Sequence, residues 1–476
     1  MMHKLWVLSI SLFLGNTCFA ELKLAPVFAD GMVLQCDTKV ALWGWAEPGA
    51  KVTASFSDQN KSVTAESDGR FMMHLDSMEA SANPQSLLVI ADGETVEVKN
   101  ILVGEVWLCA GQSNMRMTVR GVADAEQEIS SANYPNIRFF TVPKVSSKTP
   151  QTNVNAIWTT CSPETVGSCT AAGYFFGRRL HRDLKVPIGL IDVSYGGATI
   201  YTFMDADTVR KTPASDLIYK RDKVELAKEK PRPNQISSYC YNAMVHPIVP
   251  FTVRGTIWYQ GESNVGTPEE YISWYRDYME MMRAKFKSPE MPFYHVQLAG
   301  FANQTKPRPT HVPPDLWARF RLAQAKILEQ PHTGMATAMD IGMKENIHPK
   351  NKQEVGRRLA LCALNKTYDK TDVVCEGPMF QSLQRQGSTL VVSFSKCHGG
   401  LKLKGDFGGF TGVLEDGTTV AVAGKITGPD TVELNLDNHP IQRLRYAYAN
   451  YPDCPLVNGA GLPALSFDQP VNQEKN

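Results

Sequence analysis

The stretch Val103-Gly-Glu-Val-Trp-Leu-Cys-Ala-Gly-Gln-Ser-Asn-Met115 decides the fold prediction, because an apolar run leads directly into a short polar motif. The apolar part, residues 103–109, is typical of a buried β-strand. The polar part places Ser113 between a glutamine and an asparagine just where that strand ends. A surface loop would accept the same residues, so the role of Ser113 has to be judged from the rest of the chain.

Length and composition indicate an ordinary globular protein. The chain has 476 residues, of which 43% are hydrophobic and 20% charged, and this length predicts more than one domain. Its formal charge of +1 gives no attraction to a polyanion, so we expect no nucleic-acid partner. The sequence contains neither a CxxC pair nor an HExxH motif, and we therefore expect no metal site and no cofactor.

The first twenty residues have the pattern of a secretory signal peptide. Lys4 precedes an apolar centre, and the small residue Ala20 ends the segment. This predicts export, to the periplasm or out of the cell, or to the lysosome if the source is eukaryotic. No other apolar run approaches the roughly 18 residues that a membrane span needs, so we expect no stable membrane insertion.

The pattern of apolar residues changes twice along the chain. Residues 21–100 show short alternating runs separated by turn residues, which predicts a β-sandwich-like domain. In residues 101–374, apolar strands alternate with longer amphipathic stretches, which predicts an α/β catalytic domain with a parallel sheet covered on both faces. Short alternating runs return in residues 375–476 and predict a second β-rich domain or extension.

The α/β region supplies the elements of such a sheet. The expected strands are residues 105–110, 188–193, 255–259, 293–298 and 335–339. The expected helices, in which apolar residues recur at three- and four-residue steps, are residues 174–183, 269–285, 316–328 and 350–364. Parallel sheets bind ligands beyond the carboxyl ends of their strands, so the residues that follow these strands are candidates for a functional site.

Four polar segments occupy such positions. They are Gly111-Gln-Ser-Asn-Met115, Ser194-Tyr-Gly-Gly-Ala-Thr199, Trp258-Tyr-Gln-Gly-Glu-Ser-Asn264 and Asp340-Ile-Gly-Met-Lys-Glu-Asn-Ile-His-Pro349. A serine nucleophile needs a base for its proton and donors for the oxyanion that develops on the substrate. Ser113 and His348 fit the first requirement. Gly196 or Gly197 would offer backbone N–H groups.

These segments resemble the motifs of the SGNH hydrolases, which contribute serine, glycine, asparagine and histidine in that order. More narrowly, the Ser113 and Gln260 motifs, together with Ile347-His-Pro-Lys-Asn-Lys-Gln353, resemble those of the sialate O-acetylesterase family. The resemblance implies an SGNH-type three-layer α/β/α sheet and a cofactor-free serine esterase acting on O-acetylated sialic acid. It also implies Ser113 as nucleophile and His348 as general base, with an acetyl-serine intermediate.

The resemblance leaves the acid that would orient His348 open. The superfamily places an aspartate three residues before the histidine, where this chain has Glu345. We take Glu345 as the first candidate, since a glutamate can do the same work with a longer side chain. Asp340 and Glu262 are the alternatives, and a dyad without a carboxylate also remains open.

The oxyanion donors depart from the family pattern as well. The usual Gly-x-Asn is one residue longer here, in Gly261-Glu-Ser-Asn264, so either Gln260 or Asn264 is expected to supply a side-chain amide. Gly197 is the first choice for the backbone donor. Removing one such donor typically weakens transition-state binding by roughly 2.7–4 kcal/mol, so the choice is measurable.

The substrate is less constrained than the reaction. Arg116 stands three positions after the nucleophile, and its guanidinium could grip the carboxylate of a sialic acid. Acetylxylan or another acetylated carbohydrate is an alternative substrate. An alternative of another class is a non-catalytic carbohydrate-binding protein, which the complete set of catalytic residue types argues against.

Overall fold

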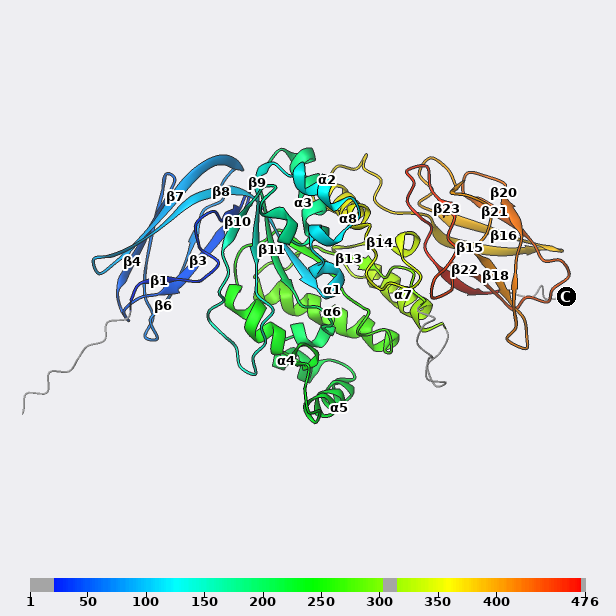
Figure 1. The fold of residues 1–476 in the computed structure, drawn as a ribbon, viewed down its shortest axis with the longest axis horizontal. Helices are drawn as coiled ribbons and strands as arrows, with labels where there is room; N and C mark the ends of the chain where they lie inside the picture. The colour runs from blue at the N-terminus through cyan, green and yellow to red at the C-terminus, as the bar shows by residue number, and fades with distance from the viewer. Residues whose placement is uncertain (1–20, 303–314, 472–476) are drawn as a thin grey trace, which may run out of the picture.

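The computed structural model describes residues 21–302 and 315–471, and the predicted signal peptide lies outside these ranges. Three parts follow one another along the long axis of the molecule (Figure 1). An antiparallel β region stands at one end, an α/β region in the middle and a second β region at the other end. No helix in the described ranges combines the length and apolar character that crossing a bilayer requires.

A mixed sheet forms the middle of the molecule. Its path runs β10-β9-β11-β8-β12-β13-β14, and every neighbouring pair from β9 to β14 is parallel. The strands are β8 (Glu94–Gly111), β9 (Tyr134–Thr141), β10 (Trp158–Cys161), β11 (Ile188–Ser194), β12 (Gly255–Tyr259), β13 (Phe293–Gln297) and β14 (Thr333–Thr337). The predicted α/β sheet is confirmed, and it has two strands that were not predicted: β9, and β10, which pairs antiparallel with β9 at the edge.

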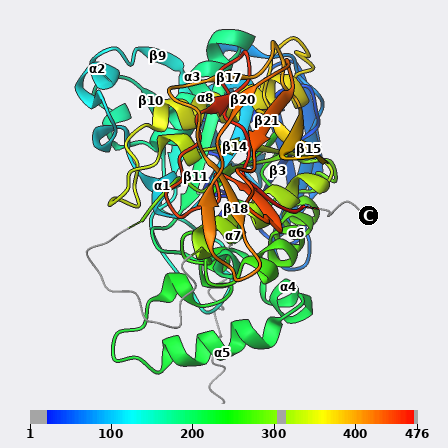
Figure 2. The same cartoon turned by 90° about the vertical axis from the view of Figure 1, so that its right-hand side faces the viewer.

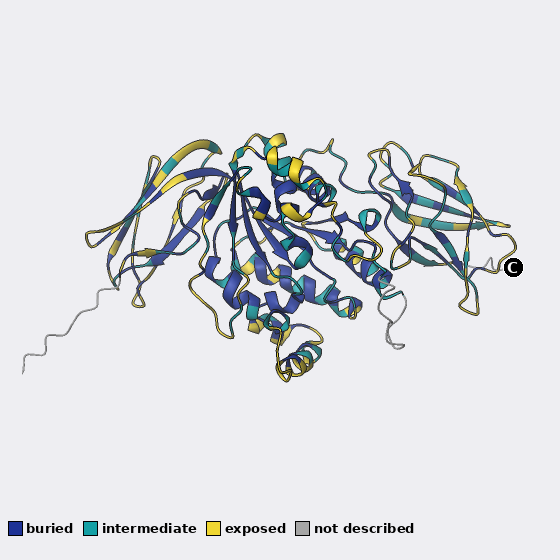
Figure 3. Ribbon diagram, viewed as in Figure 1, coloured by how far each residue is buried: buried dark blue, intermediate teal, exposed yellow. Residues whose placement is uncertain are grey.

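Helices cover both faces of this sheet. On one face α3 (Ala171–Leu184) and α8 (Lys352–Lys366) pack against each other, and on the other face α6 (Pro268–Lys285) packs with α7 (Leu316–Lys326). The four predicted helices are therefore present. Because both faces are covered, the central strands are buried along most of their length (Figure 3). The shorter helices are α1 (Ser113–Arg116), α2 (Ala125–Ser130), α4 (Ala206–Lys211) and α5 (Ser215–Leu226).

The N-terminal strands are joined to the central sheet through β8. One small sheet contains β1 (Lys23–Leu24), β3 (Val40–Trp45) and β6 (Arg70–Leu75). The other strands, β2 (Val33–Gln35), β4 (Lys51–Phe56), β5 (Gln59–Thr64) and β7 (Ser81–Ala91), belong to the same 11-stranded sheet as the central strands. The boundary expected after residue 100 falls inside β8, and one hydrophobic core continues across it.

The C-terminal region has its own hydrophobic core. Figure 2 shows this region from its own end of the molecule. Two four-stranded antiparallel sheets, β15-β16-β21-β20 and β19-β18-β22-β24, enclose buried side chains such as Phe394, Leu444 and Phe467. The strands are β15 (Met379–Gln386), β16 (Thr389–Ser395), β17 (Lys402–Leu403), β18 (Phe410–Val413), β19 (Thr419–Ala421), β20 (Gly424–Ile426), β21 (Thr431–Asn435), β22 (Arg443–Tyr446), β23 (Leu456–Val457) and β24 (Phe467–Pro470).

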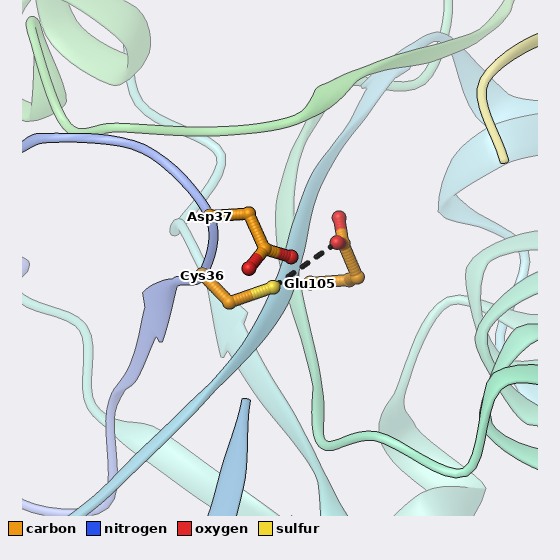
Figure 4. Close-up of side chains that lie close together, drawn as sticks. All are labelled: Cys36, Asp37 and Glu105. Carbon is orange, nitrogen blue, oxygen red and sulfur yellow. Dashed lines mark hydrogen bonds between the residues drawn. The ribbon is translucent and has the colours of Figure 1, made fainter. Parts of the chain in front are cut away.

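A buried carboxylate, Glu105, links the N-terminal strands to the middle of the molecule. Figure 4 shows its side chain beside Cys36 and Asp37, a grouping of residue types that bind metals elsewhere. Here Arg254 binds both carboxylate oxygens at 2.8 and 2.9 Å, and the Tyr368 hydroxyl donates at 2.8 Å. Because Arg254 already neutralises the carboxylate, the cluster acts as an ion-paired junction.

Candidate active site

The turn from β8 into α1 requires glycine before the serine. Gly111 has a φ of +136°, and a Cβ at this position would lie 2.2 Å from the carbonyl oxygen of Tyr259 in β12. The strand can therefore pass this close to its neighbour only without a side chain. Gln112 follows, and Ser113 is the first residue of α1. The Ser113 hydroxyl is thus presented at the carboxyl end of the sheet.

The predicted segments meet at this end. Ser194 at the end of β11 and Tyr259 at the end of β12 are both in register with Gly111. The loop after β14 brings in the histidine: Nε2 of His348 lies 2.8 Å from Oγ of Ser113. Burial, and secondly the charge of Lys352, hold the pKa of His348 below its ordinary value. A neutral imidazole in this position is able to accept the serine proton.

Gly196 lies against the serine, and Gly197 follows it in the same loop. A Cβ on Gly196 would stand 3.6 Å from Cβ of Ser113, and Gly197 has a φ of +76°, which glycine adopts readily. Their carbonyl oxygens accept hydrogen bonds from Asn234, Gln235 and Ser263. Within the described ranges, neither glycine's N–H has a protein acceptor.

The two candidate amides differ in what their nitrogens do. Nε2 of Gln260 donates to the Ala198 carbonyl at 3.1 Å and to Oδ1 of Asn264 at 2.7 Å. Oδ1 of Asn264 also accepts the N–H of Ile200. Nδ2 of Asn264 is buried and has no acceptor among the described residues. A buried N–H group without an acceptor destabilises the fold, so Nδ2 of Asn264 is a candidate donor to a bound ligand.

The sequence matches a known family over the region that carries these residues. The model for sialic acid-specific acetylesterases, a carbohydrate esterase family, matches residues 103–365. The chain belongs to this family. Human sialate O-acetylesterase is 29% identical over 414 residues, which are 79% of this chain and 77% of the human protein. The mouse sialate O-acetylesterase is 28% identical over 417 residues, or 76% of each chain.

A solved acetylesterase shares the architecture. The crystal structure of a carbohydrate acetylesterase from Xanthomonas citri has a TM-score of 0.84 and 32% sequence identity, and covers 94% of this chain and 99% of its own. The similarity therefore includes the β regions as well as the central sheet. The predicted sialate O-acetylesterase family, the fold class and the assignment as a carboxylic ester hydrolase are confirmed.

The structure does not bring a carboxylate of this acetylesterase to His348. Glu345, the first candidate, is exposed and makes no hydrogen bond or ion pair with the described residues. Asp340 is held by Arg358, which contacts both of its oxygens at 2.6 and 2.8 Å. Glu262 is buried and accepts a hydrogen bond from Nδ2 of Asn114. Among residues 21–302 and 315–471, no carboxylate therefore partners the Ser113 and His348 pair.

Arg116 has a partner within the fold. Its Nη1 lies 3.2 Å from Oδ2 of Asp192, at the end of β11, and donates to the Val142 carbonyl at 3.0 Å. Burial raises the pKa of Asp192, and the nearby Arg116 opposes this rise. The Arg116 guanidinium thus holds the buried carboxylate of Asp192 in place. This is a structural ion pair, and not the predicted contact with the carboxylate of a substrate.

Three polar residues at the site were not predicted from the sequence to have a role. Oε1 of Gln112 accepts the backbone N–H groups of Gly261 and Ser263, so it fixes the loop after β12 beside the serine. Asn114 and Lys352 form a buried hydrogen-bonded network under the histidine loop. All three residues lie in the motifs quoted above, and this was the signal that the sequence offered for them. A motif does not show which of its side chains point into the protein.

Proposed function

We propose that this chain is a serine esterase that removes O-acetyl groups from sialic acids through an acetyl-serine intermediate. The observation that carries the proposal is the 2.8 Å approach of His348 Nε2 to Ser113 Oγ at the carboxyl end of the sheet. The backbone N–H of Gly196, which lies beside Ser113, and Nδ2 of Asn264 have no acceptor among the described residues. They support the proposal, because an ester carbonyl under attack develops negative charge that such donors stabilise.

The reaction has two steps. Ser113 Oγ attacks the acetyl carbonyl carbon while Nε2 of His348 takes the hydroxyl proton, and the bond from that carbon to the sugar oxygen then breaks. The sugar oxygen leaves with the proton from His348. Water attacks the acetyl-serine in the same way, and its proton passes through His348 back to Ser113 as acetate departs.

The oxyanion is proposed to bind Nδ2 of Asn264 and the backbone N–H of Gly197, with Gly196 as the alternative backbone donor. Asn264 is favoured over Gln260 because the Gln260 side-chain N–H groups already donate to two acceptors within the protein, the Ala198 carbonyl and Oδ1 of Asn264. Gln260 then acts on Asn264 by holding its Oδ1, which aims the Nδ2 group. Glu345 stays a candidate orienting acid only if its loop moves when substrate binds.

The pH dependence should follow His348. The neutral ring is the active base, so kcat/KM is expected to be constant above the pKa of His348 and to fall below it. Because burial and Lys352 lower that pKa, the midpoint of the acidic limb should lie below 6.5. A kcat/KM profile with an acetylated sialate, from pH 4 to 8, measures it. A midpoint above 6.5 would contradict this assignment.

A cleft beside the oxyanion loop supports an acidic sugar as substrate. The cleft, of about 400 Å³, is lined by Gln235 and Ser263, which both donate to the Gly197 carbonyl at 3.0 Å. The one acidic residue of the lining, Glu225, is already paired with Lys228 and Arg232, while Lys220 and Arg221 of α5 line the other side of the cleft without an ion pair among the described residues. Two such cations would suit the carboxylate of a sialic acid.

The Arg221→Ala substitution should therefore change substrate preference. We expect KM for acetylated sialate to rise about 10-fold, since a charge-assisted bidentate contact contributes about 1.5–3 kcal/mol. Turnover of a neutral acetylated sugar should stay within 2-fold. Lys223→Ala is the matched control, because Lys223 is exposed on the same helix and does not line the cleft. An equal loss on both substrates would contradict a role in carboxylate binding.

A second substrate class has a specific observation in its favour. The Xanthomonas citri relative, described as a carbohydrate acetylesterase, matches nearly the whole chain at 32% identity. Acetate release from acetylated sialates and from acetylated xylo-oligosaccharides, measured side by side, decides between the two classes. Labelling by a fluorophosphonate, mapped to the Ser113 peptide, tests the serine mechanism independently of the sugar. Absence of labelling would favour the non-catalytic binding protein.

We also propose that the protein is exported. The support is the pattern of residues 1–20, with Lys4 ahead of an apolar run that ends at Ala20. Sequencing the N-terminus of the mature protein tests it, and a chain that begins at Glu21 is the expected product.

A further inference from the structure

The backbone on both sides of His348 is held by buried side chains. The Ile347 carbonyl accepts a hydrogen bond from Nδ2 of Asn114 at 3.0 Å, and the Pro349 carbonyl accepts one from Nζ of Lys352 at 2.7 Å. The two side chains also bind each other, since Lys352 Nζ donates to Oδ1 of Asn114 at 2.7 Å. Asn114 directly follows the nucleophile Ser113. One network therefore spans the two loops that carry the reacting atoms.

Burying the Lys352 ammonium group destabilises the fold, and the packing of α8 does not require a lysine at this position. It is 0% exposed at the start of α8 and forms no ion pair with a described carboxylate at contact distance. Its ammonium lies 5.2 Å from the centre of the Tyr259 ring. Burial lowers the pKa of Lys352 to about 7, while the charge of nearby Glu262 opposes the change. An apolar side chain would fill the same space without desolvating a charge.

The buried Lys352 matters because no described carboxylate orients His348. His348 has no carboxylate partner in the described structure, so its ring takes its position from its own backbone. The backbone N–H of His348 donates to Oδ1 of Asn346, and the two flanking carbonyls are held as described above. Glu262 completes the network by accepting from Asn114.

We propose that Lys352 and Asn114 are positioning residues for His348: they clamp the carbonyls on either side of it and fix its ring against Ser113. The inference rests on the proposed function, because it assigns a role in the same reaction. It extends the site to a lysine that touches neither substrate nor the reacting atoms.

The Lys352→Met substitution tests the proposal, since methionine fills similar space without a donor or a charge. We expect kcat to fall about 10- to 100-fold with KM within 2-fold, as for a catalytic group displaced by a fraction of an ångström. The acidic limb of the kcat/KM profile should also move to higher pH, because removing a neighbouring cation raises the pKa of His348. Lys350→Met, at an exposed lysine of the same loop, should change neither quantity.

A double-mutant cycle separates positioning from general damage. In a His348→Ala background, Lys352→Met should cause no further loss of kcat, because the residue through which it acts is gone. If Lys352→Met does not fold, Lys352→Gln, which keeps an N–H donor group and loses the charge, replaces it in the same measurements. A folded variant with wild-type kcat and an unmoved acidic limb, or an equal loss in both backgrounds, would overturn the inference. Inactivity of the wild type toward acetyl esters would instead overturn the proposed function.

Discussion

The Ser113→Ala variant is expected to lose acetate release almost completely, with kcat lowered by at least about 10⁴-fold. Ser113 Oγ is the hydroxyl that lies 2.8 Å from Nε2 of His348, so its loss leaves no activated nucleophile in the reacting position. Binding should survive, because alanine removes one atom from a preformed surface. Acetate release under saturating substrate measures the loss, and equilibrium binding of an acetylated sugar measures what remains.

The control for this variant is a serine away from the site. Ser130→Ala, on the exposed surface of α2, should keep wild-type turnover and fluorophosphonate labelling. The assignment of the nucleophile fails if Ser113→Ala keeps more than a few per cent of the wild-type rate. Unchanged labelling of the Ser113→Ala protein would point to the same failure.

The Asn264→Ala variant is expected to lower kcat about 10²- to 10³-fold with little change in KM, equivalent to about 2.7–4 kcal/mol. The reason is the buried Nδ2 group, which has no acceptor in the part of the chain that the structure describes. The contact strengthens as the ester oxygen gains charge, so the loss should fall on kcat. Steady-state kinetics on an acetylated sugar separates the two constants.

A second buried asparagine serves as the matched control. Nδ2 of Asn242 donates to the carbonyls of Ser147 and Lys148, and all three residues lie outside the catalytic motifs. Asn242→Ala should lower the thermal midpoint and leave kcat within about 2-fold, since its lost hydrogen bonds are structural. A similar small change in kcat for Asn264→Ala would transfer the oxyanion role to the backbone donors alone.

Periodicity and strand ends allowed much of the central architecture to be predicted. The five expected strands and four expected helices are present because each combines an apolar pattern with clear flanking turns. β9 was missed because Pro135, Asn136 and Arg138 interrupt its apolar run. Arg138 is nevertheless buried, with Nη2 donating to Oδ1 of Asn100 at 3.4 Å, an acceptor that only the folded chain brings near.

The resemblance of the sequence motifs to the family predicted Ser113 and His348 as partners, but motifs could not settle contacts that depend on where side chains point. Glu345 stands at the expected distance in sequence from His348, yet its turn directs it to solvent. The choice between Gln260 and Asn264 likewise depends on the Ala198 carbonyl, which comes from another loop. The role of Lys352 could not be predicted from the sequence either, because a lysine near the start of a helix is usually exposed.

The continuous strand β8 has a consequence for how such proteins diversify. One backbone segment, Glu94–Gly111, is hydrogen-bonded to the N-terminal strands along its first part and leads at its end into Ser113, the proposed nucleophile. Evolutionary exchange of the leading hundred residues would cut this strand and expose the core on both sides of the junction. The trailing region closes most of its own core, yet its Ala449 and Asn450 carbonyls accept from the buried guanidinium of Arg321 in α7, so replacing it would leave that charge without its acceptors.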